Sequence, residues 1–380
     1  MALASATPFA SFDINANTNV LDISSMLEEA LYLDFDFLSQ GLNFDLGNPV
    51  NDTTFYWNQE ALNSNTATVS GSITSVATSI SVSTGHGARF HIGDTFYVVG
   101  ANTTEVIEVT AISTDTLTIV RAVNSTTAAS IADAATVSIM PAYQEGSDIG
   151  SDKSVKPTAL SNYTQIVSPG DLLITGSQLA RQMATVALDV NRQLANRMIE
   201  LKRYWTSICL YGEKSASAGS DTVYRKTLGM RGWIRDNSGV TSSTSEALSW
   251  SVLNTHNKTL VDTGQYPDTL LIGTDLVGSI AGIDSSLRRL LETDTKAGYT
   301  VNQILLAQGN TVNVVVDGRV KTGDAFLYKK DKVSWRPLNG RGAFTIDAVD
   351  FTDGVKRRVL SEGGVEFRNP GSAAYLSNRT

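Results

Sequence analysis

The clearest hydrophobic pattern in the chain is helical and lies in the middle of the sequence. Residues 178–211 contain no glycine and no proline. Their apolar side chains recur at every third or fourth position, which is the spacing of one face of an α-helix. Ser177 can cap the start of this helix, and Lys202 and Arg203 suit its C-terminal end. The pattern predicts a spine helix of about 50 Å over 178–211.

Residues 65–140 show a different periodicity, in which apolar and polar positions alternate over short runs. The runs are rich in Thr, Val and Ile, and turn signals such as 92–94 and 113–115 separate them. Alternation with a period of two is typical of strands with one buried face. We predict a small all-β barrel or sandwich. Its expected strands are 79–83, 95–99, 105–112, 116–120 and 136–140.

The remaining segments predict an α+β fold. Near the N-terminus, Ser25 and Glu28 fit a capping box, so a short helix is expected up to Leu33. Alternating runs at 34–38 and 42–46 carry aromatic residues that need an outside surface for their burial. Further helices are expected at 247–261, 274–282 and 283–291. Strands are expected at 53–57, 162–167, 268–272, 312–316, 325–328, 333–336 and 344–346. Residues 356–361 and 364–368 are expected to form either separate strands or a hairpin.

Composition excludes several classes of protein. A length of 380 residues is enough for two or three domains. No apolar run approaches the roughly 18 residues of a membrane helix, and no secretory signal is visible at the start. The single cysteine, Cys209, excludes an internal disulfide framework, and its place in an apolar helix indicates a core residue. A pI near 5.0 argues against a dedicated DNA-binding protein.

Charge is distributed unevenly along the chain. Residues 1–150 contain 16 acidic and 2 basic residues, whereas residues 151–380 contain 22 acidic and 28 basic residues. One interpretation is that the acidic part of one copy lies on the basic part of another. The other is an acidic domain surface beside a nearly neutral one.

Few residues suggest chemistry. His86 and His91 lie five positions apart with Asp94 nearby, but a zinc site needs further ligands, so a turn before a strand is the preferred interpretation. No nucleophile elbow, P-loop or dinucleotide fingerprint is present. We expect no catalytic residue, no metal and no cofactor. The basic runs are expected on a solvated face, at a subunit contact or at weak, sequence-independent DNA contacts: Lys329, Lys330, Lys332, Lys356, Arg357 and Arg358.

The order of the elements, together with several short motifs, resembles the major capsid proteins of tailed bacteriophages (Caudoviricetes). Within that family the chain is similar to the branch with a β-barrel inserted in the extended loop. The matching segments are 55–57, 90–94, 116–121, 125–129, 156–157, 161–165, 200–203 and 228–234.

This resemblance implies a division of the chain into regions. It implies an N-terminal arm over 1–50, extended-loop limbs over 51–64 and 141–170, and an inserted β domain over 65–140. A peripheral domain with the spine helix would take 171–246 and 335–380, and an axial domain 247–334. Residues expected at subunit contacts are Phe35, Phe37, Phe44, Trp57, Tyr163, Arg197 and Arg203.

The resemblance also implies a structural function. Pentamers and hexamers of the chain would close an icosahedral shell around double-stranded DNA, in a virion that is assembled in the cytoplasm of a host bacterium. Portal, scaffold or decoration proteins would be further partners, and no membrane is involved. The alternative is a phage tail or fibre protein with a receptor-binding β domain, against which the long helix counts. An enzyme acting on glycans through paired carboxylates is a third hypothesis.

Overall fold

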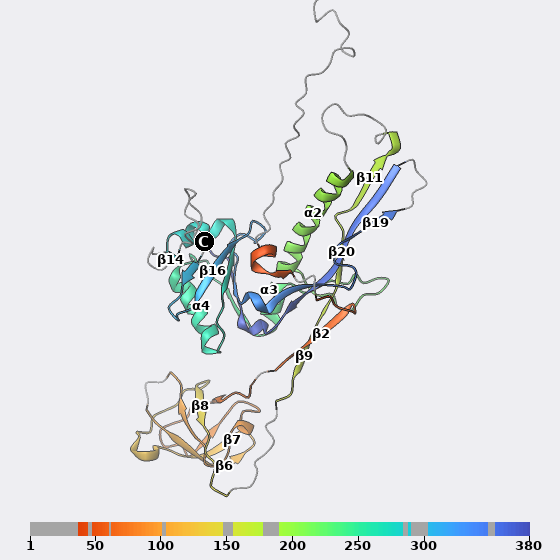
Figure 1. The fold of residues 1–380 in the computed structure, drawn as a ribbon. Coiled ribbons are helices and arrows are strands. Elements are labelled where there is room, and N and C mark those ends of the chain that lie inside the picture. Colours follow the sequence, from red (N-terminus) through yellow and green to blue (C-terminus); the bar gives the residue numbers. More distant parts are fainter. Residues whose placement is uncertain are drawn as a thin grey trace, which may run out of the picture. The chain divides into compact units, whose positions relative to one another are not determined.

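The computed structural model describes residues 37–44, 48–60, 62–100, 104–146, 155–177, 190–283, 288–289, 303–348 and 354–380 (Figure 1). The chain divides into two compact units. The main unit comprises Met1–Trp57 and Ala159–Thr380, and the inserted unit comprises Asn58–Thr158. Three predicted features lie outside the described residues: the helix up to Leu33, the first part of the spine helix, and Phe35.

The inserted unit contains a six-stranded antiparallel sheet in the order β3-β8-β5-β6-β7-β4. All five strands predicted here are confirmed, and β3 is a sixth strand that was not predicted. Alternate side chains face a fully buried interior that includes Phe96, Ile107, Leu117 and Val137. The strands are β3 (Thr66–Thr68), β4 (Ser79–Ser81), β5 (Thr95–Val98), β6 (Ile107–Ser113), β7 (Thr116–Val120) and β8 (Thr136–Met140), with short 3-10 helices η3 (Gly87–Arg89) and η4 (Val123–Ser125).

A buried ion pair ties the inserted unit together. Arg121 donates from Nε and Nη2 to the two carboxylate oxygens of Glu105, both at 2.7 Å. The amides of Ala122 and Ala129 donate to the same carboxylate. Burial alone would raise the pKa of Glu105, but the hydrogen bonds from Arg121 and from these amides outweigh it and lower the pKa.

The main unit is organised around one long strand, β20 (Gly354–Phe367). The sequence left 356–361 and 364–368 as separate strands or a hairpin, and the structure shows one continuous strand through both. Gly363 and Gly364 make no turn; a Cβ on either would lie 2.6 Å from the ring of Trp335 or of Phe55, respectively. β11 (Asp171–Thr175) and β19 (Phe344–Ala348) pair with the first half of β20, and β10 (Gln165–Val167) and β18 (Val333–Pro337) pair with its second half. β1 (Asn43–Phe44) extends the sheet by pairing with β18.

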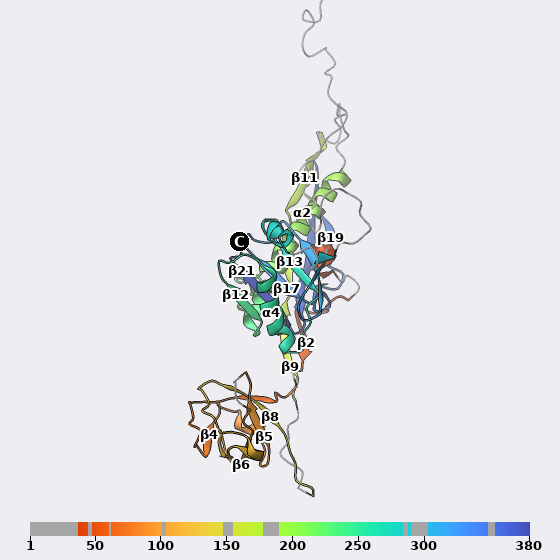
Figure 2. The ribbon, with the colours of Figure 1, turned by 90° about the vertical axis from the view of Figure 1, so that its left-hand side faces the viewer.

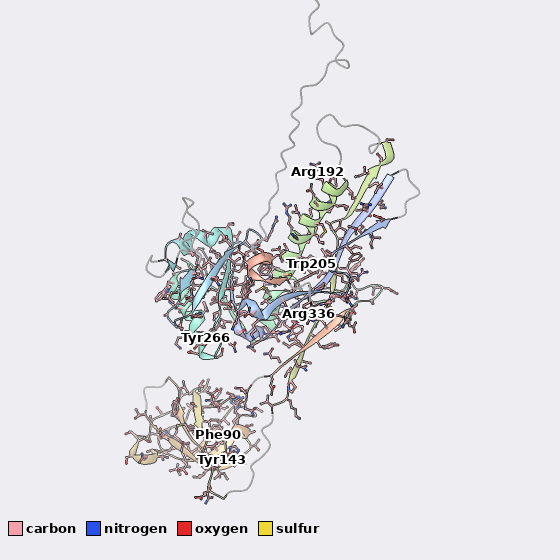
Figure 3. The ribbon with its side chains drawn as sticks, viewed as in Figure 1. Phe90, Tyr143, Arg192, Trp205, Tyr266 and Arg336 are labelled. Carbon is pink, nitrogen blue, oxygen red and sulfur yellow. The ribbon has the colours of Figure 1, made fainter. Side chains whose placement is uncertain are left out.

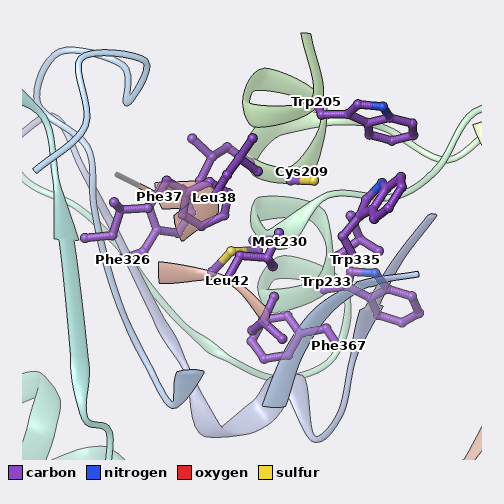
Figure 4. Packing of buried hydrophobic residues seen from close by; sticks show 14 of the residues in the cluster. Phe37, Leu38, Leu42, Trp205, Cys209, Met230, Trp233, Phe326, Trp335 and Phe367 are labelled. Atoms are coloured by element: carbon purple, nitrogen blue, oxygen red, sulfur yellow. The ribbon is translucent and has the colours of Figure 1, made fainter. Parts of the chain in front are cut away.

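Helix α2 (Val190–Tyr211) lies along β11 and β20 and supplies much of the core (Figure 1). It confirms the predicted spine helix over the described residues. Its Trp205 packs edge-on against Trp335, with ring centroids 5.2 Å apart, and donates from Nε1 to Ser361 Oγ at 2.9 Å. Cys209 is fully buried on the same helix, as its apolar setting predicted (Figure 4). Helix α3 (Met230–Asp236) and the π-helix η2 (Phe37–Gly41) complete this core.

A second, seven-stranded mixed sheet forms the rest of the main unit, in the order β12-β21-β17-β13-β16-β15-β14 (Figure 2). Its strands are β12 (Val240–Ser243), β13 (Thr269–Ile272), β14 (Arg288–Arg289), β15 (Gln303–Leu305), β16 (Thr311–Val316), β17 (Ala325–Tyr328) and β21 (Ala374–Ser377). Its helices are α4 (Trp250–Asp262), α5 (Val277–Ala281), η5 (Thr274–Leu276), η6 (Lys330–Lys332) and η7 (Pro370–Ser372). The helix predicted at 283–291 is wrong at its described residues Arg288–Arg289, because they pair with β15 as a strand.

The strands predicted at 53–57 and 162–167 are both present. The first is β2 (Thr54–Gln59), which pairs with β9 (Thr158–Tyr163) as a two-stranded sheet. The second is divided between β9 and β10, because Thr164 separates the two strands.

Candidate intersubunit surfaces

Two of the aromatic residues predicted near the N-terminus, Phe37 and Phe44, fall within the described part of the main unit. Phe37 is fully buried beside Phe326, and its amide donates to Asp317 Oδ2 at 3.0 Å (Figure 4). Its ring therefore belongs to the core of its own chain and offers no exposed surface to a neighbour. Phe44 lies in β1, at the position that pairs with Trp335 of β18.

Trp57 and Tyr163 lie on the paired strands β2 and β9. The ring of Trp57 stacks on Phe55 with centroids 5.8 Å apart and contacts Trp233 at 5.0 Å. Tyr163 is partly buried under Lys214, whose Nζ lies 4.6 Å from the ring centroid. Both predicted residues therefore have contacts within the chain and retain some exposed surface.

Lys214 is a feature that the sequence did not indicate. Its ammonium group donates to the carbonyl oxygen of Ser161 at 2.6 Å and to the hydroxyl of the same residue at 3.2 Å. Burial away from water lowers its pKa, because the charged form loses solvation. A lysine that is held by neutral oxygen atoms belongs to no periodic pattern, so the sequence alone does not identify it.

The predicted arginines of the spine helix lie on α2. Arg197 forms an ion pair with Glu200 one turn later, at 2.6 Å, and both side chains are about one-third exposed. Arg203 is partly buried on the same helix. Pairs of this kind on a helix surface add only about 0.3–0.5 kcal/mol, so they stabilise the monomer weakly.

The two basic runs differ in their surroundings. Lys330 and Lys332 lie on η6, and these two residues and Lys329 are all partly exposed. In contrast, Lys356, Arg357 and Arg358 lie on β20 and face carboxylates of neighbouring strands. Arg357 Nε lies 2.8 Å from an oxygen of Asp347, and Arg358 Nη2 donates to Asp171 at 2.9 Å, with Lys356 Nζ 3.9 Å from the same residue.

Two buried glutamates further along β20 were missed by sequence reasoning. Glu366 is fully buried and accepts hydrogen bonds from Arg336 at 2.6 Å and from Arg368. Glu362 accepts from Arg341 at 2.6 Å and from Arg225. The guanidinium of Arg336, which is labelled in Figure 3, also donates to the carbonyl oxygen and the side-chain oxygen of Asn48. The only available signal was the spacing of the two glutamates, which puts both on one face of a strand.

The two histidines singled out in the sequence have local partners in the inserted unit. His86 Nδ1 accepts the amide of Thr68 at 2.9 Å. His91 Nε2 lies 2.9 Å from the hydroxyl of Tyr143, and its Nδ1 lies 3.5 Å from Asp94. Over the described ranges, no group of three or more His, Cys, Asp or Glu side chains is arranged to hold a metal ion.

No helix in the described part of the chain is long and apolar enough to cross a membrane.

Comparison with known proteins gives a consistent result. Residues 20–380 match the SU10 major capsid protein family. Among solved structures, a chain of Gordonia phage Cozz is 10% identical, with 98% of each chain covered and a TM-score of 0.50. A chain from the capsid of Myoviridae phage XM1 is 12% identical, with 96% of this chain and 98% of that chain covered and a TM-score of 0.49. No curated protein matches the sequence significantly.

The family match covers nearly the whole chain, and the mixed α+β architecture fits it. The likeness to the Cozz chain extends over the full length and supports the same fold. The chain therefore belongs to the SU10 major capsid protein family, has the fold of tailed-phage major capsid proteins, and is a phage capsid shell protein.

Proposed function

We propose that copies of this chain associate into closed pentamers and hexamers, and that these build an icosahedral shell around double-stranded phage DNA. The observation that carries the proposal is the charge split within one chain, with 16 acidic and 2 basic residues before residue 151 and a basic excess after it. A chain whose two parts attract each other favours head-to-tail contacts between copies. Such heterologous contacts close into rings when the rotation allows.

The regions take separate roles in this proposal. Residues 1–50 act as an arm, and residues 51–64 and 141–170 form the limbs of an extended loop that carries the β domain of 65–140. The spine helix and the sheet around β20 form the peripheral domain (171–246 and 335–380). The seven-stranded sheet belongs mainly to an axial domain (247–334) near the centre of each capsomer.

Further partners follow from the same proposal. A portal protein, and a scaffold or decoration protein, would complete the shell, which is assembled in the cytoplasm of the host bacterium. Lys329, Lys330 and Lys332 are candidates for sequence-independent contact with packaged DNA or for subunit contact. A few lysines suffice for such contacts, because phosphate binding without base recognition is electrostatic.

Electron microscopy of the purified recombinant chain at low and moderate salt tests the assembly. We expect shells, or rings with five- and six-fold symmetry, and fewer of them at moderate salt because screening weakens exposed charges. If only monomers appear, co-expression with a scaffold protein from the same genome follows. Monomers that persist after co-expression would contradict the proposal, and an elongated trimer would favour the tail or fibre alternative.

A further inference from the structure

The seven-stranded sheet of the main unit ends at a strand with an open edge. β12 is its outermost strand and pairs with β21 alone among the described strands (Figure 2). The amide of Val240 donates to the carbonyl oxygen of Ala373, at 3.0 Å. In a parallel ladder both main-chain groups of a residue point to one side, and the side alternates along the strand. Val240 and Ser242 therefore face β21. Thr241 and Ser243 direct their main-chain groups away from it.

These outward main-chain groups of β12 have no partner within the described part of the chain. Neither the amides nor the carbonyls of Thr241 and Ser243 form a hydrogen bond there, and both residues are exposed. Helix α4 packs on the face of the sheet that carries the side chain of Val240, and α3 lies over the opposite face, so the helices cover the faces and leave the edge open. The open edge thus offers two donors and two acceptors at the spacing of an extended polypeptide.

A pocket of about 590 Å³ borders the open edge on the α3 side. Its floor carries hydroxyl groups, because the two outward residues of β12 are the register partners of Tyr375 and Ser377, and register partners share a face of the sheet. Arg231 and Arg235 of α3 form its wall. None of the described residues that line the pocket is acidic.

The charges around the pocket are nevertheless balanced. Arg231 donates from Nη2 to Glu213 at 2.7 Å. Arg235 donates to Glu213 at 3.1 Å and to Asp236 at 2.7 Å. Two guanidinium groups therefore meet two carboxylates. Arg231 still has its Nε and Nη1 without a hydrogen bond to any described residue. The pocket offers hydrogen-bond donors to a ligand without an excess of positive charge.

This combination favours an extended polypeptide as the ligand. DNA binding depends on an excess of basic groups, and the DNA backbone has no hydrogen-bond donor for the outward carbonyls. An α-helix uses its main-chain groups for its own hydrogen bonds, so it would leave the open edge unpaired. A strand supplies main-chain donors and acceptors and projects alternate side chains over the pocket. Side chains that accept hydrogen bonds from Arg231 are those of Asp, Glu, Asn and Gln.

A second copy of β12 fits the open edge less well than such a segment. Its main-chain groups could pair with Thr241 and Ser243. Its own outward side chains are the same two residues, so it would bring hydroxyl groups but no carboxylate or amide to Arg231. A different polypeptide has no such restriction.

We propose that the open edge of β12 binds an extended segment of a partner protein by strand addition. The segment forms main-chain hydrogen bonds with Thr241 and Ser243 and places an Asp, Glu, Asn or Gln side chain in the adjacent pocket, beside Arg231. The inference concerns the single chain and does not depend on the proposed assembly.

Binding of synthetic peptides to the unassembled full chain tests the inference. The probes are short fluorescent peptides in which Thr alternates with Glu, Asp, Gln or Ala, and fluorescence anisotropy measures their affinity. We expect the peptides with side-chain carboxylates or amides to bind more tightly than the Ala peptide. The tightest peptide is then N-methylated at its odd-numbered or at its even-numbered residues. Only one set of amides faces β12 in strand addition, so one methylated version should lose binding and the other should keep it.

Substitutions in β12 and α3 locate the site. Thr241→Pro and Ser243→Pro each remove one outward donor and keep the amides that face β21, and an edge strand tolerates proline at such positions. Each should weaken binding about fivefold, which is the effect of one hydrogen bond. Thr241→Val keeps the amide and is the matched control, with a smaller loss expected. Arg231→Met should reduce the affinity of the Glu peptide to that of the Ala peptide. Circular dichroism checks that each variant is folded.

Several results would overturn the inference: no binding of any peptide, equal losses for the two methylated versions, or unchanged binding to Thr241→Pro. Displacement of the peptide by inorganic phosphate or by a DNA duplex would overturn it in favour of an anion site. A dimer of the chain that Thr241→Pro dissociates, seen by size-exclusion chromatography, would assign the open edge to a second copy instead. If the proline variants do not fold, the methylated peptides decide. Shell formation is measured separately, so a failure here leaves the proposed function standing.

Discussion

The packing of Trp205 gives the sharpest test of the structure of the main unit. Its side chain is 2% exposed, lies edge-on to Trp335 and hydrogen-bonds to Ser361. Replacement by Ala removes a large buried ring, which costs about 3–5 kcal/mol when the cavity does not collapse. Total stabilities are about 5–15 kcal/mol, so Trp205→Ala should remove a large part of the free energy of unfolding.

A second variant separates the hydrogen bond from the packing. Trp205→Phe keeps an aromatic ring against Trp335 and loses the bond to Ser361, whose hydroxyl still donates to the carbonyl of Gly342. The expected cost is about 1–2 kcal/mol, from the hydrogen bond and the smaller ring. Tyr204→Ala is the matched control, because Tyr204 is the neighbouring helix residue and is 49% exposed; its effect should stay within about 0.5 kcal/mol.

The assay follows from the positions of the five tryptophans. All of them lie in the main unit, at positions 57, 205, 233, 250 and 335, so tryptophan fluorescence during urea unfolding reports on that unit alone. Unassembled subunits are used, because assembly would add to the apparent stability. A loss below about 1 kcal/mol for Trp205→Ala, or equal losses for it and Tyr204→Ala, would refute the packing described here.

The remaining predictions concern three other sites. Arg121→Ala leaves Glu105 buried without its partner and should cost the inserted unit about 3–5 kcal/mol, seen as faster proteolysis of that unit with unchanged tryptophan fluorescence. Because the folded state lowers the pKa of Glu105, the ionised carboxylate adds to the free energy of unfolding at pH values above its ordinary pKa of 4.5, and this stabilisation is lost as the pH falls through the folded pKa. Glu105→Gln should therefore weaken the dependence of stability on acid pH, as followed by circular dichroism. Burial raises the pKa of Asp324, so ionisation of this carboxyl group opposes folding as the pH rises. Asp324→Asn should therefore raise the melting temperature at pH 7 more than at pH 4. A smaller increase at pH 7 than at pH 4 would contradict this reasoning. Gly364→Ala places a Cβ against Phe55 and should cost about 1–3 kcal/mol in urea unfolding.

The elements that could be predicted from the sequence are those with a sustained local period. The spine helix and five strands of the inserted unit have such patterns, and the structure confirms them where it describes them. β3, β11 and β15 were not predicted, and pairing with distant segments defines them. The sequence divided the closing strand into 356–361 and 364–368, whereas the structure has one strand in which Gly363 and Gly364 leave room for two aromatic rings.

The contacts of the candidate surfaces are still harder to predict, because they join residues far apart in the sequence. Arg225 and Glu362 are 137 positions apart, and Arg358 and Asp171 are 187 apart. The sequence identified the basic residues but not the carboxylates that face them. A net charge counted along the chain therefore overstates the charge that is available to a neighbouring copy.

This internal pairing bears on how salt should act on assembly. Arg357 and Arg358 pair with Asp347 and Asp171, so only part of the basic excess of the C-terminal half is free to attract an acidic segment. Charges of this kind steer association and set its orientation more than they add affinity. Moderate salt should therefore slow the formation of shells more than it lowers their stability once formed.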